Sequence, residues 1–95
     1  LVDMKLRLES SRWLSYNAGW QLQNRRRCDL DASLSKLLIS ESAVQSGLDA
    51  VQIHGALGCL AGSPAAEALL DAIPARVFSG TSEMQRMVIA KALGL

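Results

Sequence analysis

The chain has 95 residues, of which 49% are hydrophobic and 20% are charged, and its formal net charge is +1 at pH 7. This length allows one small domain, with a radius of gyration of about 12 Å if it is compact. A nearly neutral chain argues against nucleic acid or an acidic membrane as its main partner. No apolar run is long enough to cross a membrane, so a transmembrane placement is not expected.

The cysteine and histidine content excludes two further classes of protein. Cys28 and Cys59 form no CxxC pair, and His54 has no second ligand at helical spacing. We therefore expect reduced thiols, no disulfide framework and no metal site. The charge run at residues 25–27 is interpreted as solvated arginines that oppose the negative end of a preceding helix. The apolar content exceeds what a small helical monomer needs, which indicates a piece of a larger protein that packs on another domain or subunit.

The first element is predicted as a long helix over residues 2–23. It lacks proline and carries two neighbouring apolar stripes. The first stripe contains Met4, Leu8, Ser11, Ser15, Ala18 and Leu22, and the second contains Val2, Leu6, Trp13 and Trp20. An apolar face of this width predicts contacts with at least two other helices.

A short polar connection at residues 24–29 leads into a second long helix, predicted over residues 30–57. Either Asp29 or Asp31 is expected to cap its start, and Gly58 is expected to end it. The connection is short enough for an antiparallel pair of helices.

Two residues inside this second helix stand out. Gly47 weakens a helix interior by about 1 kcal/mol relative to alanine, so we expect it at a tight helix–helix contact. Glu41 interrupts an apolar stripe. It is either a buried acid with a functional partner or a solvated residue at the border of the stripe, and the pattern favours the solvated residue.

The remainder reads as two shorter helices. Pro64 suits a first helical turn, and a helix follows over residues 65–72. Residues 75–78 are predicted as a brief extended or irregular segment, and the last helix is predicted over residues 82–93, ended by Gly94. Because no convincing strand is present, the predicted fold is an all-α antiparallel helical bundle.

The segment Phe78-Ser79-Gly80-Thr81-Ser82-Glu83-Met84-Gln85-Arg86 combines a glycine turn with a helix start. Ser82 precedes Gln85 by three residues, which is the spacing of a capping box. Free backbone N–H groups at such a helix start suit a polar or anionic ligand. An ordinary capped helix fits the same residues.

The segment Gln52-Ile53-His54-Gly55-Ala56-Leu57-Gly58 lies at the end of the second long helix. Its glycines are helix-ending signals. The functional interpretation is a helix end that is opened so that the backbone, Gln52 and His54 can meet a ligand.

The two segments together resemble the C-terminal helical domain of the acyl-CoA dehydrogenase family of flavoproteins. Members of that family carry Gln-x-x-Gly-Gly-x-Gly followed by Tyr-Glu-Gly-Thr-Ser-Glu-Ile-Gln-Arg. The matching residues are Gln52, Gly55, Gly58, Gly80, Thr81, Ser82, Glu83, Gln85 and Arg86. The resemblance covers essentially the whole chain. It implies that residues 1–95 are a C-terminal helical bundle domain lacking its first helix, with an N-terminal helical domain and a β-domain outside this chain.

The resemblance also implies FAD as the cofactor and assigns residues to it. The residues that would line the ADP and pyrophosphate part of a neighbouring subunit's FAD are Gln52, Ile53, His54, Gly55 and Ala56. Thr81, Ser82 and Glu83 would approach the FAD of their own subunit. Gly80 would border the acyl thioester, and Lys91 occupies a position where relatives often place an arginine near the coenzyme A adenine.

The chain departs from the family pattern at the position of chemistry. Ser79 stands where many relatives carry the glutamate that removes the α-proton of the acyl thioester while the flavin takes a β-hydride. A serine hydroxyl is not a base at neutral pH without an activator, and no histidine or aspartate is placed locally. Either the base comes from outside this chain, or the protein is not an α,β-dehydrogenase. Ala56, Leu70 and the pair at residues 73–74 also depart from the pattern, which points to a divergent, secondary-metabolic or carrier-protein-dependent relative.

The resulting hypothesis is the C-terminal domain of an FAD-dependent dehydrogenase that oxidises an acyl thioester of coenzyme A or a carrier protein. We expect a homo-oligomer (dimer or tetramer), an electron-transfer partner, and a place in the bacterial cytoplasm or, in a eukaryote, the mitochondrial matrix. One alternative is a catalytically silent or structural subunit that contributes to oligomerisation and to a neighbour's FAD site. Another is a plain helical bundle with chance motif matches.

Overall fold

The computed structural model describes residues 1–24 and 26–95, and these residues form helices and connections without a strand. The elements in chain order are α1 (Val2–Gln23), α2 (Asp29–His54), the 3₁₀ helix η1 (Gly55–Cys59), α3 (Pro64–Ala72), the 3₁₀ helix η2 (Ile73–Arg76) and α4 (Ser82–Ala92). The predicted all-α antiparallel bundle is confirmed.

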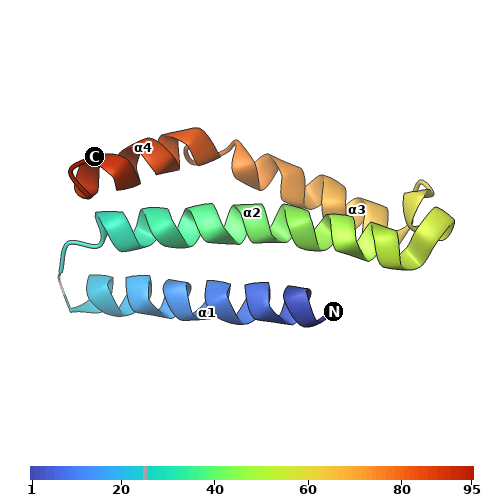
Figure 1. Ribbon diagram of the computed structural model, residues 1–95, viewed down its shortest axis with the longest axis horizontal. Coiled ribbons are helices and arrows are strands. Elements are labelled where there is room, and N and C mark those ends of the chain that lie inside the picture. The colour runs from blue at the N-terminus through green and yellow to red at the C-terminus, as the bar shows by residue number, and fades with distance from the viewer. Residues whose placement is uncertain (25) are drawn as a thin grey trace.

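Helix α2 lies at the centre of the molecule. Helix α1 packs antiparallel along one side of it, and α3, η2 and α4 return along the other side (Figure 1). An α-helix of 26 residues is about 39 Å long, so α2 sets the length of the whole molecule. The molecule measures 47 × 22 × 21 Å with a radius of gyration of 15.3 Å, which is more elongated than the compact domain expected from its length.

Small residues, rather than large apolar ones, fill the seams around α2. The buried residues of α2 are Ser33, Ser35, Ser40, Ser42, Val44 and Gly47. Their polar atoms are satisfied locally, since the Ser40 hydroxyl donates to the Lys36 carbonyl and the Ser15 and Ser35 hydroxyls lie 3.3 Å apart. Small side chains let helix axes approach closely, so close backbone approach replaces a large hydrophobic core here.

The second apolar stripe of α1 has no partner helix among the described residues. Val2, Trp13 and Trp20 are 82%, 70% and 50% exposed. The described residues give α1 one extensive helix contact, with α2, and its predicted contact with a second helix stays a prediction. What covers the exposed stripe stays a prediction, namely another domain or subunit.

The boundaries of α2 differ from the prediction at both ends. Cys28 occupies the N-cap position without a side-chain bond, so neither Asp29 nor Asp31 caps the helix. The Asp31 carboxylate instead accepts a hydrogen bond of 2.6 Å from the Asn17 amide of α1. At the other end Gly55, with φ of 60°, stops the helix at His54, so the predicted stop at Gly58 is wrong.

The bounds of the shorter elements agree with the prediction more closely than those of α2. Helix α3 begins at Pro64 as predicted, and its N-cap is Ser63, whose hydroxyl accepts from the Ala66 N–H. The segment before the glycine turn is not extended, because η2 ends only at Arg76 and the Phe78 N–H donates to the Pro74 carbonyl at 3.0 Å. Helix α4 ends one residue earlier than predicted.

The arginine run is only partly described. Arg25 lies outside the described residues. The Arg26 guanidinium lies 4.9 Å from the centre of the Trp20 ring, and Arg27 pairs with Asp29 at 3.5 Å on the surface. Along the described ranges, the helices lack the combination of length and hydropathy that a membrane span requires.

Gly47 lies at the tight contact predicted for it. A Cβ atom placed on Gly47 would come within 2.9 Å of the Leu69 Cα atom of α3. The same atom on Gly19, near the C-terminal end of α1, would meet nothing within 4 Å. The two helical glycines therefore form a matched pair for measuring the cost of adding a side chain at the α2–α3 contact.

We predict opposite effects of alanine at these two positions on the free energy of unfolding. Gly47→Ala should destabilise the protein by about 1–2 kcal/mol, because forced overpacking outweighs the gain in helix propensity. Gly19→Ala should stabilise it by about 0.5–1 kcal/mol. Urea unfolding followed by circular dichroism measures both. A stabilising effect of Gly47→Ala would show that α3 is free to move away from α2.

Candidate functional site at the start of α4

The turn before α4 holds two consecutive residues in the left-handed region. Ser79 has φ of 55° and Gly80 has φ of 89°. A residue other than glycine in this region carries about 1–2 kcal/mol of strain, so the surroundings of Ser79 must hold it there. One such contact is the Gln85 amide, which donates to the Ser79 carbonyl at 3.2 Å. A Cβ atom on residue 80 would lie 2.6 Å from the same amide nitrogen, so a side chain there would displace the Gln85 amide.

The cap of α4 is Thr81 rather than Ser82. The Thr81 hydroxyl accepts from the Met84 N–H at 3.2 Å, so the predicted capping box of Ser82 and Gln85 is wrong by one residue. Ser82 is the first residue of the helix and is only 1% exposed. Its hydroxyl donates to Oε1 of Glu41 at 2.6 Å and thus ties the helix start to α2.

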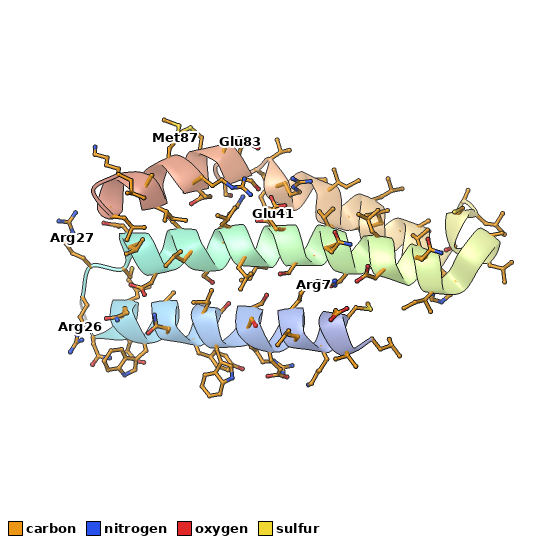
Figure 2. The ribbon with its side chains drawn as sticks, in the orientation of Figure 1. Arg7, Arg26, Arg27, Glu41, Glu83 and Met87 are labelled. Atoms are coloured by element: carbon orange, nitrogen blue, oxygen red, sulfur yellow. The ribbon has the colours of Figure 1, made fainter. Side chains whose placement is uncertain are left out.

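Glu41 is the acceptor that joins α2, η2 and α4. Besides the Ser82 hydroxyl, its Oε1 accepts from Nε of Arg76 at 3.0 Å and lies 3.9 Å from Nη2 of Arg86. Figure 2 shows Glu41 between α2 and α4, whereas Glu83 and Met87 lie on the outer side of α4. The Glu41 side chain is 31% exposed and its carboxylate is paired, so it lies between the two predicted alternatives, the buried acid with a partner and the solvated border residue.

The surroundings of Glu41 hold its pKa below the ordinary value of a carboxyl. The hydrogen bond from Ser82 is the main cause, and the hydrogen bond and charge of Arg76 and the charge of Arg86 act in the same direction. Partial desolvation opposes them. The pKa of Glu83 is also lowered, chiefly by the backbone N–H of Glu83 itself and then by the Thr81 hydroxyl. The start of α4 therefore stabilises negative charge.

Lys36 of α2 also contacts the turn that precedes α4. Its Nζ donates to the Gly80 carbonyl at 2.6 Å and to the Ala75 carbonyl at 2.9 Å. Lys36 and Phe78 both line a cavity of about 490 Å³ between α1, α2, η2 and the residues that follow η2. A smaller hollow of about 220 Å³ opens at the start of α4, lined by Ile73, Arg76, Val77, Thr81, Ser82 and Glu83.

The five residues predicted at the end of α2 lie together and are exposed. Gln52, Ile53 and His54 form the last turn of α2, and Gly55 and Ala56 begin η1. The His54 ring is held by a hydrogen bond of 2.7 Å between Nδ1 and the Ala50 carbonyl. These residues can therefore be reached from outside the chain.

The chain does not bring all the predicted site residues together. Ser79, Gly80, Thr81, Ser82 and Glu83 form one continuous site. Residues 52–56 lie about 16 Å or more along α2 from Glu41, and Lys91 lies about 16 Å along α4 from the turn. The roles predicted for these residues in binding cofactor or substrate stay predictions.

Sequence reasoning missed Lys36 and Arg76 entirely. Their partners are 35–44 residues away along the chain, so no local spacing marks them. Glu41 did leave a signal, since a carboxylate inside an apolar stripe needs a partner when it is not solvated.

Residues 1–94 match the family described as "Acyl-CoA dehydrogenase, C-terminal domain". The chain belongs to the acyl-CoA dehydrogenase family. The family resemblance expected from the two segments is thereby confirmed, and with it the all-α fold of that domain.

Three members illustrate the similarity. The chain is 46% identical over 95 residues to an L-prolyl-[peptidyl-carrier protein] dehydrogenase of Serratia sp., covering 100% of this chain and 25% of the relative. It is 42% identical over 94 residues to an acyl-CoA dehydrogenase of Bacillus subtilis, covering 98% of this chain and 24% of the relative. It superimposes on the FAD complex of PigA with a TM-score of 0.94 at 47% identity, covering 99% of this chain and 24% of that chain. The chain thus spans about a quarter of the length of these family members.

We predict that Glu41 gives the protein an acid-sensitive component of stability. The folded-state pKa of Glu41 lies below the ordinary 4.5, so the paired carboxylate stabilises the fold above that pH, and this contribution is lost as the pH falls through the folded-state pKa. Glu41→Gln should lower the free energy of unfolding at pH 7 by about 1–2 kcal/mol. Below pH 4.5 the free energy of unfolding of the variant should decrease less steeply with pH than that of the wild type.

Urea unfolding at a series of pH values measures this effect, with Glu67→Gln, an exposed carboxylate of α3, as the matched control. The control should follow the wild type at every pH. If the free energy of unfolding of Glu41→Gln decreases as steeply below pH 4.5 as that of the wild type, Glu41 is not the source of the acid sensitivity.

Proposed function

We propose that this chain is the C-terminal domain of an FAD-dependent dehydrogenase that oxidises the α,β-bond of a thioester, with a carrier-protein-bound aminoacyl group as the favoured substrate class. The single observation that carries the proposal is the whole-chain identity of 46% to an L-prolyl-[peptidyl-carrier protein] dehydrogenase. The likeness to PigA, whose structure holds FAD, supports the choice of cofactor.

The geometry at the start of α4 fits a cofactor with polar and anionic groups. The hollow there is lined by Thr81, Ser82 and Glu83, beside the N-terminal end of an 11-residue helix. Because Ser82 is only 1% exposed and bound to Glu41, its proposed part is to hold the helix start in place beside Thr81 and Glu83, which would approach the cofactor. When bound, FAD supplies the acceptor for the hydride. Gln52, Ile53, His54, Gly55 and Ala56 would line the ADP and pyrophosphate of a neighbour's FAD.

The base is proposed to come from outside this chain. Ser79 stands at the position of the family's glutamate, and the single histidine of the sequence, His54, is at the far end of α2. A serine without such an activator does not remove an α-proton at neutral pH. Gly80 would border the thioester, and Lys91 would approach the adenine of a coenzyme A substrate.

An acyl-CoA substrate is the second candidate, favoured by the 42% identity to an acyl-CoA dehydrogenase. A catalytically silent subunit is the alternative of a different class. Under either enzymatic proposal the partners are the N-terminal and β-domains, further copies in a dimer or tetramer, and an electron-transfer partner. The proposed location is the bacterial cytoplasm or the mitochondrial matrix.

We predict that the full-length protein is yellow and that a prolyl-loaded carrier protein bleaches its flavin absorbance faster than butyryl-CoA does. Stopped-flow absorbance under anaerobic conditions measures both reactions. Faster bleaching by butyryl-CoA would establish the second candidate instead. A yellow protein that neither probe bleaches would favour the silent subunit, and a colourless protein would refute the proposal.

We further predict that the Ser79 hydroxyl is dispensable for flavin reduction. Ser79→Ala removes the hydroxyl and keeps the left-handed strain, while Ser79→Gly removes both the hydroxyl and the strain. Both variants should reduce flavin within about threefold of the wild-type rate, since a serine in this setting is not the base. A loss of a hundredfold or more in both variants would assign the hydroxyl to the chemistry.

A further inference from the structure

The contact between Lys36 and the turn is unusual for a lysine. Its two partners are backbone carbonyls, of Ala75 and Gly80, that stand before and after the left-handed Ser79. An ammonium group has three donors and no acceptor, so one side chain can bind both carbonyls at once. A charged donor also makes a stronger hydrogen bond than a neutral one.

Both carbonyls of the strained pair are held from the protein side. The Ser79 carbonyl accepts from the Gln85 amide at 3.2 Å, and the Gly80 carbonyl accepts from Lys36 at 2.6 Å. Because a trans peptide group is planar, each carbonyl points opposite to the N–H of the next residue. Holding these two carbonyls therefore directs the N–H groups of Gly80 and Thr81 away from Lys36 and Gln85.

Helix α2 holds the turn at two points. Lys36 and Glu41 are five residues apart, about 7.5 Å along the helix axis. Lys36 binds the two carbonyls, and Glu41 binds the Ser82 hydroxyl just beyond the turn and Arg76 just before it. Since η2 and α4 are too short to be stable alone, these side chains of α2 determine where the turn lies.

We propose that Lys36 is a positioning residue for the thioester site. It fixes the backbone of Ser79 and Gly80 so that the turn presents its N–H groups in one conformation before any ligand arrives. This role rests on the proposed function, in which that turn borders the substrate. In this role Lys36 acts through the backbone of the turn and not on the substrate itself.

The test compares Lys36→Met with Lys5→Met in the full-length flavoprotein. Methionine keeps the length and the apolar stem of lysine and removes its donors. Lys5 is an exposed lysine of α1 paired with Glu9, so the same change there is the matched control. Two quantities are measured, namely amide hydrogen exchange by mass spectrometry and kcat/KM with the thioester that bleaches the wild-type flavin.

We expect Lys36→Met to raise exchange at least fivefold in peptides covering residues 77–83, with α1 and α3 peptides unchanged. We expect kcat/KM to fall about tenfold or more relative to Lys5→Met, because a misplaced turn no longer fits the transition state, while flavin content and Tm stay equal. If Lys36→Met does not fold, Lys36→Gln carries the same test, since its shorter neutral amide cannot span both carbonyls.

Unchanged exchange over residues 77–83 would overturn the proposal. So would a rise in exchange throughout the chain with a lower Tm, which would assign Lys36 to general stability. Faster local exchange with unchanged kcat/KM would also overturn it. If neither thioester bleaches the wild-type flavin, the proposed function fails. The hydrogen-exchange comparison alone then decides whether Lys36 holds the turn.

Discussion

One oxygen atom of Glu41 joins three elements, namely α2, which carries it, η2 and α4. It accepts the Ser82 hydroxyl and the Arg76 guanidinium, and Arg86 lies at 3.9 Å. Ser82 is 1% exposed, so its hydroxyl has no water to replace this partner, and an unpaired buried hydroxyl is costly. Helices of 9 and 11 residues are marginal in isolation. Their place on α2 therefore depends on this carboxylate together with the tight contact at Gly47.

The central helix serves as the common frame for the other elements. Its buried surface consists mainly of serines and one glycine, which let α1 and α3 approach closely but bury little apolar area. Hydrophobic burial is roughly proportional to area, so polar tethers from Lys36 and Glu41 supply specificity that a large core would otherwise provide. The site at the start of α4 is thus defined by side chains that α2 contributes.

Much of the fold follows from the sequence because helical periodicity is a local property. The extent of α1 was predicted on that basis, the start of α3 from the preference of Pro64 for a first helical turn, and the close contact at Gly47 from the cost of glycine inside a helix. The end of α2 was not, because Gly55 and Gly58 are both plausible stops and a 3₁₀ turn continues the apolar pattern between them. The predicted cap of α4 was wrong by one residue because Thr81 and Ser82 are both good N-cap residues, and only the distant Glu41 decides between them.

The partners of Glu41 and Lys36 depend on tertiary neighbours that no spacing reveals. The motif residues themselves came from the family resemblance, and physical reasoning added how the turn is held.

The left-handed backbone at Ser79 acts as a steric filter on how this position can diversify. Threonine, valine and isoleucine carry a second heavy atom on Cβ and are strongly disfavoured at positive φ. Glycine, asparagine and aspartate accept it far more readily. Substitutions at residue 79 should therefore be limited to side chains that are not branched at Cβ, whatever chemistry a homologue performs. The backbone conformation should be retained even where the side chain differs.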